Sequence, residues 1–414
     1  MGAEMGKLKI DKLLRGKSAL NLIAAALVLS GIAVGFAMLM TTTVALGVAI
    51  ILAGVCLGSL LFSVASRSQL VIPLLALNLL VFFNIFRDIN FFSIGTLVNS
   101  LGNTVLSGNL VFILHRATEL VLLAIGMTLV TSASKGQDIS VGATAAIAGS
   151  VFVRVVLANE FSLLYMVIAF AVACLVSLVF AAFNGTLVAV FRIQPMIASL
   201  IMFTTGRSIA YWINGGATPT VNNHQWLDAF SRFIPGIPVH TPIITAVVCG
   251  IIILLVLKFT NLGLYTQSVG INEKSARLNG INPIKVKMTA FLIMGICVTI
   301  AGVINVGRIG LINHVTILRG IEMDAILAVA IGGNALSGGK FKLSGSVIGA
   351  YVITGLTETL YAMRVSSTDI QAYKAVVIIL LVVIGSPVVK EKIGQLAGSL
   401  RKKKEAPAEG KGHA

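Results

Sequence analysis

Charged residues are scarce in this sequence. Only 11% of its 414 residues are Asp, Glu, Lys or Arg, whereas a soluble domain carries about 25%. A chain with so little charge cannot cover a soluble globule, so that class is excluded. Acidic residues are the rarer sign, because 15 Asp and Glu stand against 31 Lys and Arg. In so apolar a chain this excess indicates basic cytoplasmic loops rather than a nucleic-acid partner.

Cysteine and histidine are too few and too scattered to form a metal centre. The four cysteines lie inside apolar runs without ligand spacing, so we interpret them as small core residues. They are Cys56, Cys174, Cys249 and Cys297. The five histidines, which we expect at surface or boundary positions, are His115, His224, His240, His314 and His413. No nucleophile stands beside a plausible base, so we expect no catalytic residue, no metal and no enzyme activity.

A phosphate-binding loop is also missing. The nearest match is the stretch NALSGGKF, residues 334 to 341. The motif needs Gly at its first position and Ser or Thr at its last, where this chain has Asn334 and Phe341. We therefore expect that this chain binds no cofactor and hydrolyses no ATP itself. Lys340 and Lys342 are interpreted as cytoplasmic anchors.

Long apolar runs, in contrast, fill most of the chain. Hydrophobic residues make up 57% of it, and the mean hydropathy is +0.98. A run of about 18 apolar residues or more can cross a bilayer core of about 30 Å. We predict an all-α, polytopic transmembrane helical bundle with about twelve membrane segments. They cover residues 19–40, 44–65, 70–86, 111–133, 141–158, 163–190, 195–213, 241–258, 286–307, 322–335, 343–361 and 371–388, of which 322–335 is the weakest and could be a half-helix.

Four parts of the chain differ in composition. They are a basic cytoplasmic N-terminus (1–18), an N-terminal transmembrane hairpin (19–66), the main transmembrane domain (67–389) and a basic tail expected to be disordered (390–414). The first apolar run is too long for a signal peptide, so we expect it to be retained. Both hairpin helices carry small-residue pairs, Gly31 with Gly35 and Gly54 with Gly58, a spacing that lets two helices approach closely.

The distribution of Lys and Arg predicts the topology. With the N-terminus inside and twelve crossings, most of the 31 basic residues fall on the cytoplasmic side. Both termini are then cytoplasmic, and the chain is a multi-pass protein of a bacterial inner or plasma membrane. The polar loops 87–110 and 214–240 lie outside, and 259–285 lies on the cytoplasmic face.

A polar break interrupts two apolar runs between Ser132 and Ser140. In lipid an unpaired backbone group costs several kcal/mol, so a break must be buried in protein or face water, as it does in transporters. Asp138 can cap the helix that follows or lie in a translocation path. The same two interpretations hold for Glu322 and Asp324, which open the short segment 322–335, because acids at membrane depth often mark pathways.

A short amphipathic helix is predicted in the cytoplasmic stretch NEKSARLNGINP, residues 272 to 283. Ser275 and Ala276 are small, and Gly280 follows four residues after Ala276. With its small residues outward, such a helix would be a docking element for a partner. An ordinary loop helix is the alternative.

Several long strings are similar to a known family. LLAIGMTLV with GQDISVGATAAIAG, FNGTLVAVFRIQPMIASLIMFTTGR, VGINEKSARLNGINPIKVK and GIEMDAILAVAIGGNALSGGKFKLSGSVIGA occur in family order between about residues 111 and 385. They resemble the membrane subunit of ATP-binding cassette sugar importers, the ribose, xylose, arabinose and galactofuranose permeases. The galactofuranose type is the most similar. The pathway and gate candidates in these strings are Gln137, Asp138, Ser140, Asn184, Gln194, Glu322, Asp324 and Asn334.

The resemblance implies a mechanism and a set of partners. Two permease subunits, identical or paralogous, would form the pathway in the membrane lipid. Separate ATPase subunits would bind ATP and Mg below, and a periplasmic or lipoprotein solute-binding protein would deliver a monosaccharide. By position, KSARLNG corresponds to the family's Glu-Ala-Ala-x3-Gly coupling sequence. The coupling candidates are Asn272, Glu273, Lys274, Ser275, Ala276, Arg277 and Gly280.

Two departures and two alternatives stay open. Gln137 replaces the family's Ile at the break, and the hairpin 19–66 lies outside the family core of about ten helices. The cargo could instead be a nucleoside or another small polar solute. An ion-coupled secondary transporter is the other class, which fits the broken helices but not the coupling-like stretch.

Overall fold

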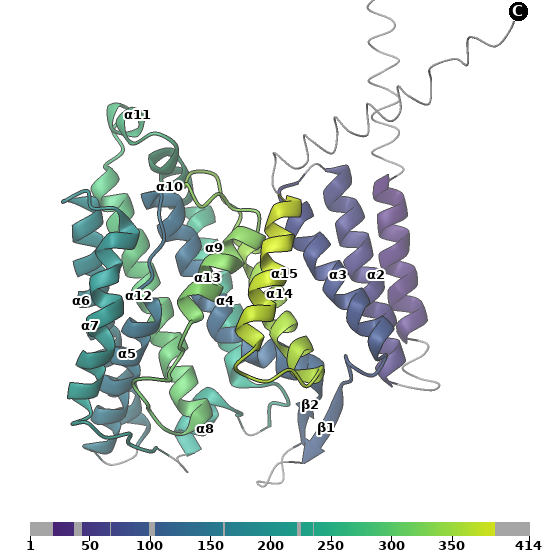
Figure 1. The fold of residues 1–414 in the computed structure, drawn as a ribbon, viewed down its shortest axis with the longest axis horizontal. Coiled ribbons are helices and arrows are strands. Elements are labelled where there is room, and N and C mark those ends of the chain that lie inside the picture. Colours follow the sequence, from purple (N-terminus) through teal and green to yellow (C-terminus); the bar gives the residue numbers. More distant parts are fainter. Residues whose placement is uncertain are drawn as a thin grey trace, which may run out of the picture.

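A computed structural model describes residues 20–36, 44–66, 68–98, 104–159, 162–221, 225–234 and 236–385. Nearly all of this part is helical (Figure 1). An unlabelled helix, Leu20–Phe36, comes first. The labelled elements follow: α2 (Val44–Ala65), α3 (Val71–Arg87), β1 (Gly95–Val98), β2 (Thr104–Ser107), α4 (Asn109–Ser134), α5 (Val141–Leu157), α6 (Leu163–Ala189), α7 (Pro195–Ile213), α8 (Gln225–Ser231), α9 (Thr241–Phe259), α10 (Leu262–Ile271), α11 (Glu273–Leu278), α12 (Pro283–Ile309), α13 (Ile321–Ile331), α14 (Leu343–Ala362) and α15 (Ile370–Gly385).

The long helices run roughly side by side between two ends of the molecule (Figure 1). One end carries α10 and α11 and is called the α11 end. The other carries α8 and an antiparallel hairpin of β1 and β2, in register from Gly95 opposite Ser107 to Val98 opposite Thr104. It is called the hairpin end. The bundle of apolar helices confirms the predicted polytopic helical class, while twelve crossings remain a prediction.

Helices α4 and α12 form the centre of the bundle. Most of their residues are buried, and they pack against each other in one large apolar core with α13 and α14. Helices α6 and α9 lie outside, with many exposed Leu, Ile and Val side chains. Their outward faces suit contact with lipid hydrocarbon.

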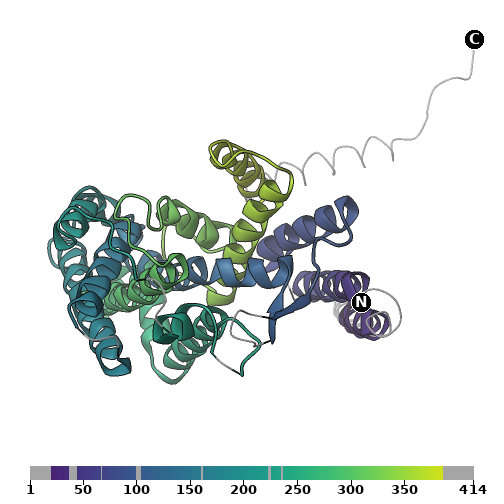
Figure 2. The same cartoon turned by 90° about the horizontal axis from the view of Figure 1, so that it is seen from below.

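The N-terminal hairpin packs through its glycines, as predicted. A Cβ on Gly31 would lie 2.9 Å from the Cα of Gly54, so neither position has room for a side chain. This close approach joins the Leu20–Phe36 helix to α2 at the edge of the bundle, beside α3 (Figure 2). Two closely packed helices therefore lie within the predicted hairpin, whose bounds 19–66 and membrane crossing stay predictions. The predicted end segments 1–18 and 390–414 lie outside the described residues.

Segment α13 is a half-helix. It has 11 residues, which at 1.5 Å per residue is only about 16 Å, half of the bilayer core. The predicted range 322–335 was too long, because Gly332 and Gly333 end the helix in a turn. The two polar loops also contain elements that we did not predict, the β1–β2 hairpin in 87–110 and α8 in 214–240.

Two ion pairs join charged side chains of the central helices. Arg308 of α12 contacts Glu119 of α4 at 2.6 Å, and Glu119 is almost fully buried. Arg116 of α4 contacts Glu358 of α14 at 3.0 Å. Pairing offsets part of the cost of placing these charges in an apolar interior, which is several kcal/mol for an isolated charge. His115 is likewise buried, against the ring of His240, so the surface or boundary position expected for it was wrong.

Candidate functional site: the broken helix, the half-helix and α11

The polar break begins where α4 ends. Lys135 takes a left-handed conformation with φ 60°, and its N–H still donates to the Thr131 carbonyl. Its side-chain Nζ donates to the carbonyl of Ile271, the last residue of α10, at 3.2 Å. The break therefore touches the segment that leads directly into α11.

The middle of the break forms a buried hydrogen-bond network. Asp138 Oδ1 accepts from the N–H of Ser140 at 2.9 Å and from its hydroxyl at 2.6 Å. Asn184 of α6 donates to the Ser140 hydroxyl at 2.9 Å. The Ile139 N–H donates to Ser199 of α7 at 3.0 Å. Asp138 thus caps the turn before α5, and no bond to the first amides of α5, which the capping interpretation implied, is formed in the described structure.

A glycine-rich turn between α13 and α14 closes over the break. Gln137 Nε2 donates to the Leu336 carbonyl at 3.1 Å. Asn334 bonds to both backbone groups of Lys342 and to the Ser346 hydroxyl, so it holds the turn together. Gly270 of α10 lies so close to the Ser132 carbonyl that a Cβ there would overlap it. Three segments distant in sequence therefore meet without spare room.

The start of α13 forms a second polar cluster deeper in the bundle. Arg207 of α7 donates to the carbonyls of His314, Val315 and Ile317 at 2.9, 3.2 and 3.0 Å. These bonds hold the loop that enters α13. The carboxylate of Glu322 is buried against α5, and its Oε2 has no hydrogen-bond partner among the described residues.

Asp324 has a partner that the sequence did not suggest. Lys374 of α15 contacts it at 2.7 Å, and the Lys374 side chain is nearly buried. Gly320, not an acidic side chain, occupies the cap position of α13. Glu322 and Asp324 do lie in the first turn of α13, where a carboxylate suits the helix dipole, and the carboxylate of Asp324 also ties the half-helix to α15.

Helix α7 exposes polar side chains over its second half. It is the least apolar of the six long apolar helices in the described part of the chain, yet most of it is not buried. Thr204, Thr205, Ser208 and Tyr211 are exposed on its second half, and Arg207 is partly exposed beside them. Gln194, at the α7 start, is also exposed, and no side-chain cap bond forms there. Apolar side chains of the same helix are exposed as well, Ile201 and Trp212 among them, so the surface of α7 mixes polar and apolar groups.

Helix α11 forms at the predicted place. The Asn272 side chain accepts from the Ser275 N–H and caps it. Glu273 contacts Lys287 of α12 at 2.7 Å, and that hydrogen bond lowers the pKa of the Glu273 carboxyl. These contacts fix a six-residue helix that would be marginal alone.

One detail of the α11 prediction was wrong. Ala276 faces inward and is buried in the apolar core, whereas Ser275 is exposed as expected. The outermost side chain is Leu278, which is 89% exposed. Lys274 and Arg277 are exposed too, and Gly280 has a left-handed φ of 79° that ends the element. The surface offered to a partner is therefore a leucine flanked by two basic residues.

Taken together, a buried broken helix, a half-helix and an exposed polar helix face define a membrane transport subunit. The family described as branched-chain amino acid transport system / permease component matches residues 109–385. The chain belongs to this family, whose members are permease components of transporters and not enzymes. The N-terminal hairpin lies outside the match.

Named relatives agree with this assignment. The chain is 33% identical to the fructose import permease protein FruF of Bifidobacterium longum, over 74% of this chain and 84% of the relative. It is 38% identical to the galactofuranose transporter permease protein YtfT of Escherichia coli, over 68% and 80%. It is 34% identical to the E. coli ribose import permease protein RbsC, over 71% and 87%. No solved structure matches the chain.

Proposed function

We propose that this chain is the membrane permease of an ATP-binding cassette importer for a monosaccharide. The observation that carries the proposal is α11, an exposed helix whose base is held against the break. An ATP-driven permease needs a contact point for separate ATPase subunits, and α11 provides one. An ion-coupled carrier needs no such contact. The sugar-import names of three relatives support the cargo.

Movement at α11 has a direct route into the bundle. Asn272 joins α10 to α11, and Ile271 accepts from Lys135 at the break. The close contact of Gly270 with Ser132 leaves no slack between them. A push on Leu278 would therefore shift α10, the end of α4 and the network of Asp138 as one unit. In this proposal Gln137, Ser140, Asn184 and Asn334 belong to the moving gate.

The translocation path is assigned to the exposed polar face of α7 and the neighbouring start of α13. Thr205 and Ser208 would contact the hydroxyl groups of a passing sugar, while Gln194 stands at the inner mouth. Glu322 and Asp324 would stabilise the half-helix beside the path. One chain forms one wall, so a second permease copy or a paralogue would form the other.

The remaining partners follow from the same proposal. ATPase subunits would bind ATP and Mg and grip α11, which places the α11 end and both termini in the cytoplasm. A solute-binding protein would dock at the hairpin end. The membrane is then the inner or plasma membrane of a bacterium.

Reconstitution tests the proposal. Proteoliposomes holding this chain, its ATPase and its binding protein should take up labelled sugar only with ATP. Leu278→Asp should abolish coupled uptake, because a carboxylate would replace the apolar contact, while Leu264→Asp, exposed on α10, is the matched control. Uptake by the chain alone under a proton or sodium gradient would refute the motor-driven mechanism.

The cargo needs its own comparison. Ribose, fructose, galactose, a nucleoside and leucine should be offered to the same proteoliposomes, because the family description names branched-chain amino acids. We expect uptake of one monosaccharide. Uptake of leucine alone, or of the nucleoside alone, would leave the ATP-driven mechanism in place but show that the cargo is not a sugar.

A further inference from the structure

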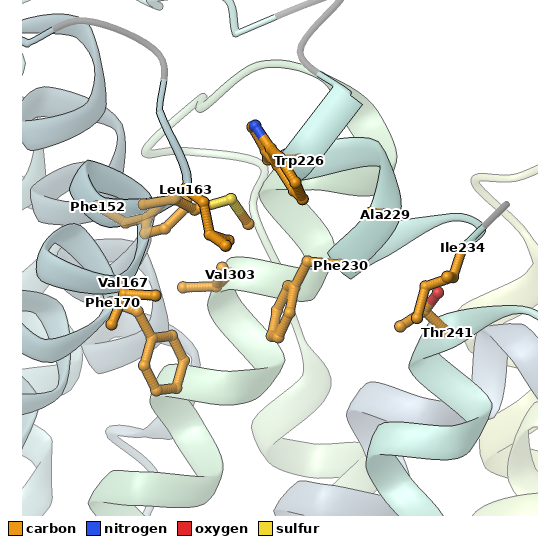
Figure 3. A pocket seen from close by; sticks show the side chains of 11 residues that line it. Phe152, Leu163, Val167, Phe170, Trp226, Ala229, Phe230, Ile234, Thr241 and Val303 are labelled. Carbon is orange, nitrogen blue, oxygen red and sulfur yellow. The ribbon is translucent and has the colours of Figure 1, made fainter.

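A cavity of about 490 Å³ lies beside α11, and its walls come from two distant parts of the chain. We call it the α11 pocket. Its lining residues are Arg192, in the turn between α6 and α7, and Glu273, Lys274, Arg277 and Leu278 of α11. Charge distinguishes it from a cavity of about 330 Å³ under α8, whose walls are almost entirely apolar (Figure 3). A charged lining selects its occupant by charge.

The α11 pocket carries an excess of positive charge. Glu273 is the one acid of its lining, and Lys287 contacts that carboxylate at 2.7 Å. The hydrogen bond from Lys287 lowers the pKa of Glu273, and the positive charges of Arg192 and Arg277 add to this effect. Arg192, Lys274 and Arg277 are exposed and form no ion pair among the described residues. The pocket therefore offers three cations to an anion from outside the chain.

Arg192 occupies a strained backbone position. Its φ is 59°, a left-handed conformation that glycine adopts freely and that a residue with a side chain rarely adopts. The end of α6 fixes this geometry, because the Ile193 N–H donates to the Leu187 carbonyl at 3.0 Å. Strained residues cluster at binding and switch sites. A role of the guanidinium in the pocket explains an arginine here better than the turn does, since glycine would suit the turn.

The position of α11 and its exposed leucine favour a protein over a lipid headgroup. Helix α11 stands beyond the ends of the long helices (Figure 1), so its side of the pocket lies farther out than the level where the apolar helices end. Leu278 is 89% exposed. A leucine among cations matches a protein surface that has an apolar socket with an acidic side chain next to it.

We propose that the α11 pocket receives an aspartate or glutamate side chain of the ATPase subunit, which pairs with Arg192 and Arg277 while Leu278 enters an apolar socket. This inference rests on the proposed function and extends it, because it states the chemistry of the partner surface and adds a contact residue outside α11. Arg192 lies three residues before Pro195, where α7 begins. The ATPase subunit would therefore hold α11 and the start of α7 together, and its movement would reach both.

Binding of the ATPase subunit to the full chain tests the pocket. The chain is placed in nanodiscs of phosphatidylcholine, which carries no net charge, and Kd is measured. Arg192→Gln should raise Kd about tenfold, the value of one charged hydrogen bond. Lys258→Gln removes an exposed cation at the same end of the bundle and is the matched control, so it should bind like the parent chain.

The outcomes separate the pocket from the proposed function. If Leu278→Asp abolishes binding and Arg192→Gln leaves Kd unchanged, the acidic contact is wrong and the ATPase contact at α11 stands. If the parent chain binds no ATPase subunit, both are wrong. If phosphatidylglycerol in the nanodisc displaces the ATPase subunit from the parent chain but not from Arg192→Gln, the occupant is a lipid headgroup and the proposal is overturned.

Arg192→Gly distinguishes a partner contact from a role in the turn. The variant removes the guanidinium and the backbone strain together, so Tm in detergent should not fall, while Kd should rise as in Arg192→Gln. A lower Tm with an unchanged Kd would show that Arg192 only shapes the turn.

Cross-linking with a carbodiimide, which joins a lysine amine to a carboxylate in contact with it, identifies the partner group. In the assembled complex Lys274 should be linked to an aspartate or glutamate of the ATPase subunit. Arg192→Lys should add a link from residue 192 to the same region, and Lys258 should form none. Links from Lys258 alone, or no link from either pocket position, would overturn the proposal.

Discussion

Helices α7 and α9 have the same length and different exposed surfaces. Each has 19 residues and one basic residue, Arg207 in α7 and Lys258 in α9, and only 28% and 11% of their apolar stretches are buried. Yet α9 exposes Val, Ile and Leu along most of its length, whereas α7 exposes polar side chains such as Thr205 and Ser208 among apolar ones such as Ile201 and Trp212. In the proposed importer, the exposed side chains of α9 would contact lipid, whereas the exposed polar side chains of α7 would contact the path or a second subunit.

The comparison would fail if the polar residues of α7 only stabilised the fold. A buried ion pair away from α7 serves as the reference, because breaking it should lower the stability of the fold without changing α7. Glu119→Gln breaks the bond to Arg308 and leaves that cation without its carboxylate, which we expect to cost about 3 kcal/mol. Thermal unfolding in detergent should record a clear fall in Tm. An unchanged Tm would show that the pair is not structural.

The basic residue of each helix gives the next test. Arg207→Ala removes three hydrogen bonds to the loop before α13, worth about 2–3 kcal/mol together. If these hydrogen bonds hold α13 in the position that transport requires, the transport rate of the variant should fall at least about tenfold. A loss of about 1.4 kcal/mol corresponds to a factor of ten in rate.

Lys258→Ala is the matched control on α9, because Lys258 is exposed and forms no ion pair in the described structure. Its transport rate should stay near the parent value. Equal losses in the two variants would mean that α7 and α9 do not differ in role.

The smallest effect concerns how firmly α11 is held. Glu273 has a lowered pKa because Lys287 donates to it, so the pair stabilises α11 above the unfolded pKa of about 4.3. That contribution is lost as the pH falls through the lower, folded pKa. Glu273→Gln should weaken α11 by less than about 1 kcal/mol, because the pair is partly exposed.

Hydrogen exchange of the α11 amides checks this prediction. At pH 7 the variant should exchange faster than the parent protein, and the ratio should approach one in acid below the folded pKa of Glu273. A ratio that is constant with pH would contradict the role given to the pair. α7 amides are the internal control.

The sequence predicted the long helices well and the contacts between them poorly. The runs at 163–190 and 195–213 match α6 and α7 almost to the residue, because bilayer thickness sets a length that composition reveals. The inward face of Ala276 could not be predicted, since a six-residue helix is too short for periodicity to show. The β1–β2 hairpin was missed because four-residue strands give almost no alternating pattern.

The site was predicted in parts that the fold then joined. The sequence shows Asp138 and Ser140 as parts of a local break, and Asn184 was a separate candidate. The hydrogen bond from Asn184 to Ser140 joins residues 44 positions apart, so the sequence could not predict it. Lys374 lies 50 residues after its partner Asp324, and no local sequence pattern connects the two. Arg207 stands inside a quoted string, yet nothing local indicates that it binds a loop more than 100 residues away. Only tertiary contact reveals such pairs.

One measurement tests the central contrast between α7 and α9 most directly. After alanine replaces the four natural cysteines, a single cysteine is introduced at Ser208 or at Leu254, the equivalent positions of the two helices. The active importer in proteoliposomes is then treated with a membrane-impermeant maleimide. The account predicts that the cysteine on α7 reacts during ATP turnover and that the cysteine on α9 does not. Equal reaction at both positions, or reaction on α9 alone, would contradict it.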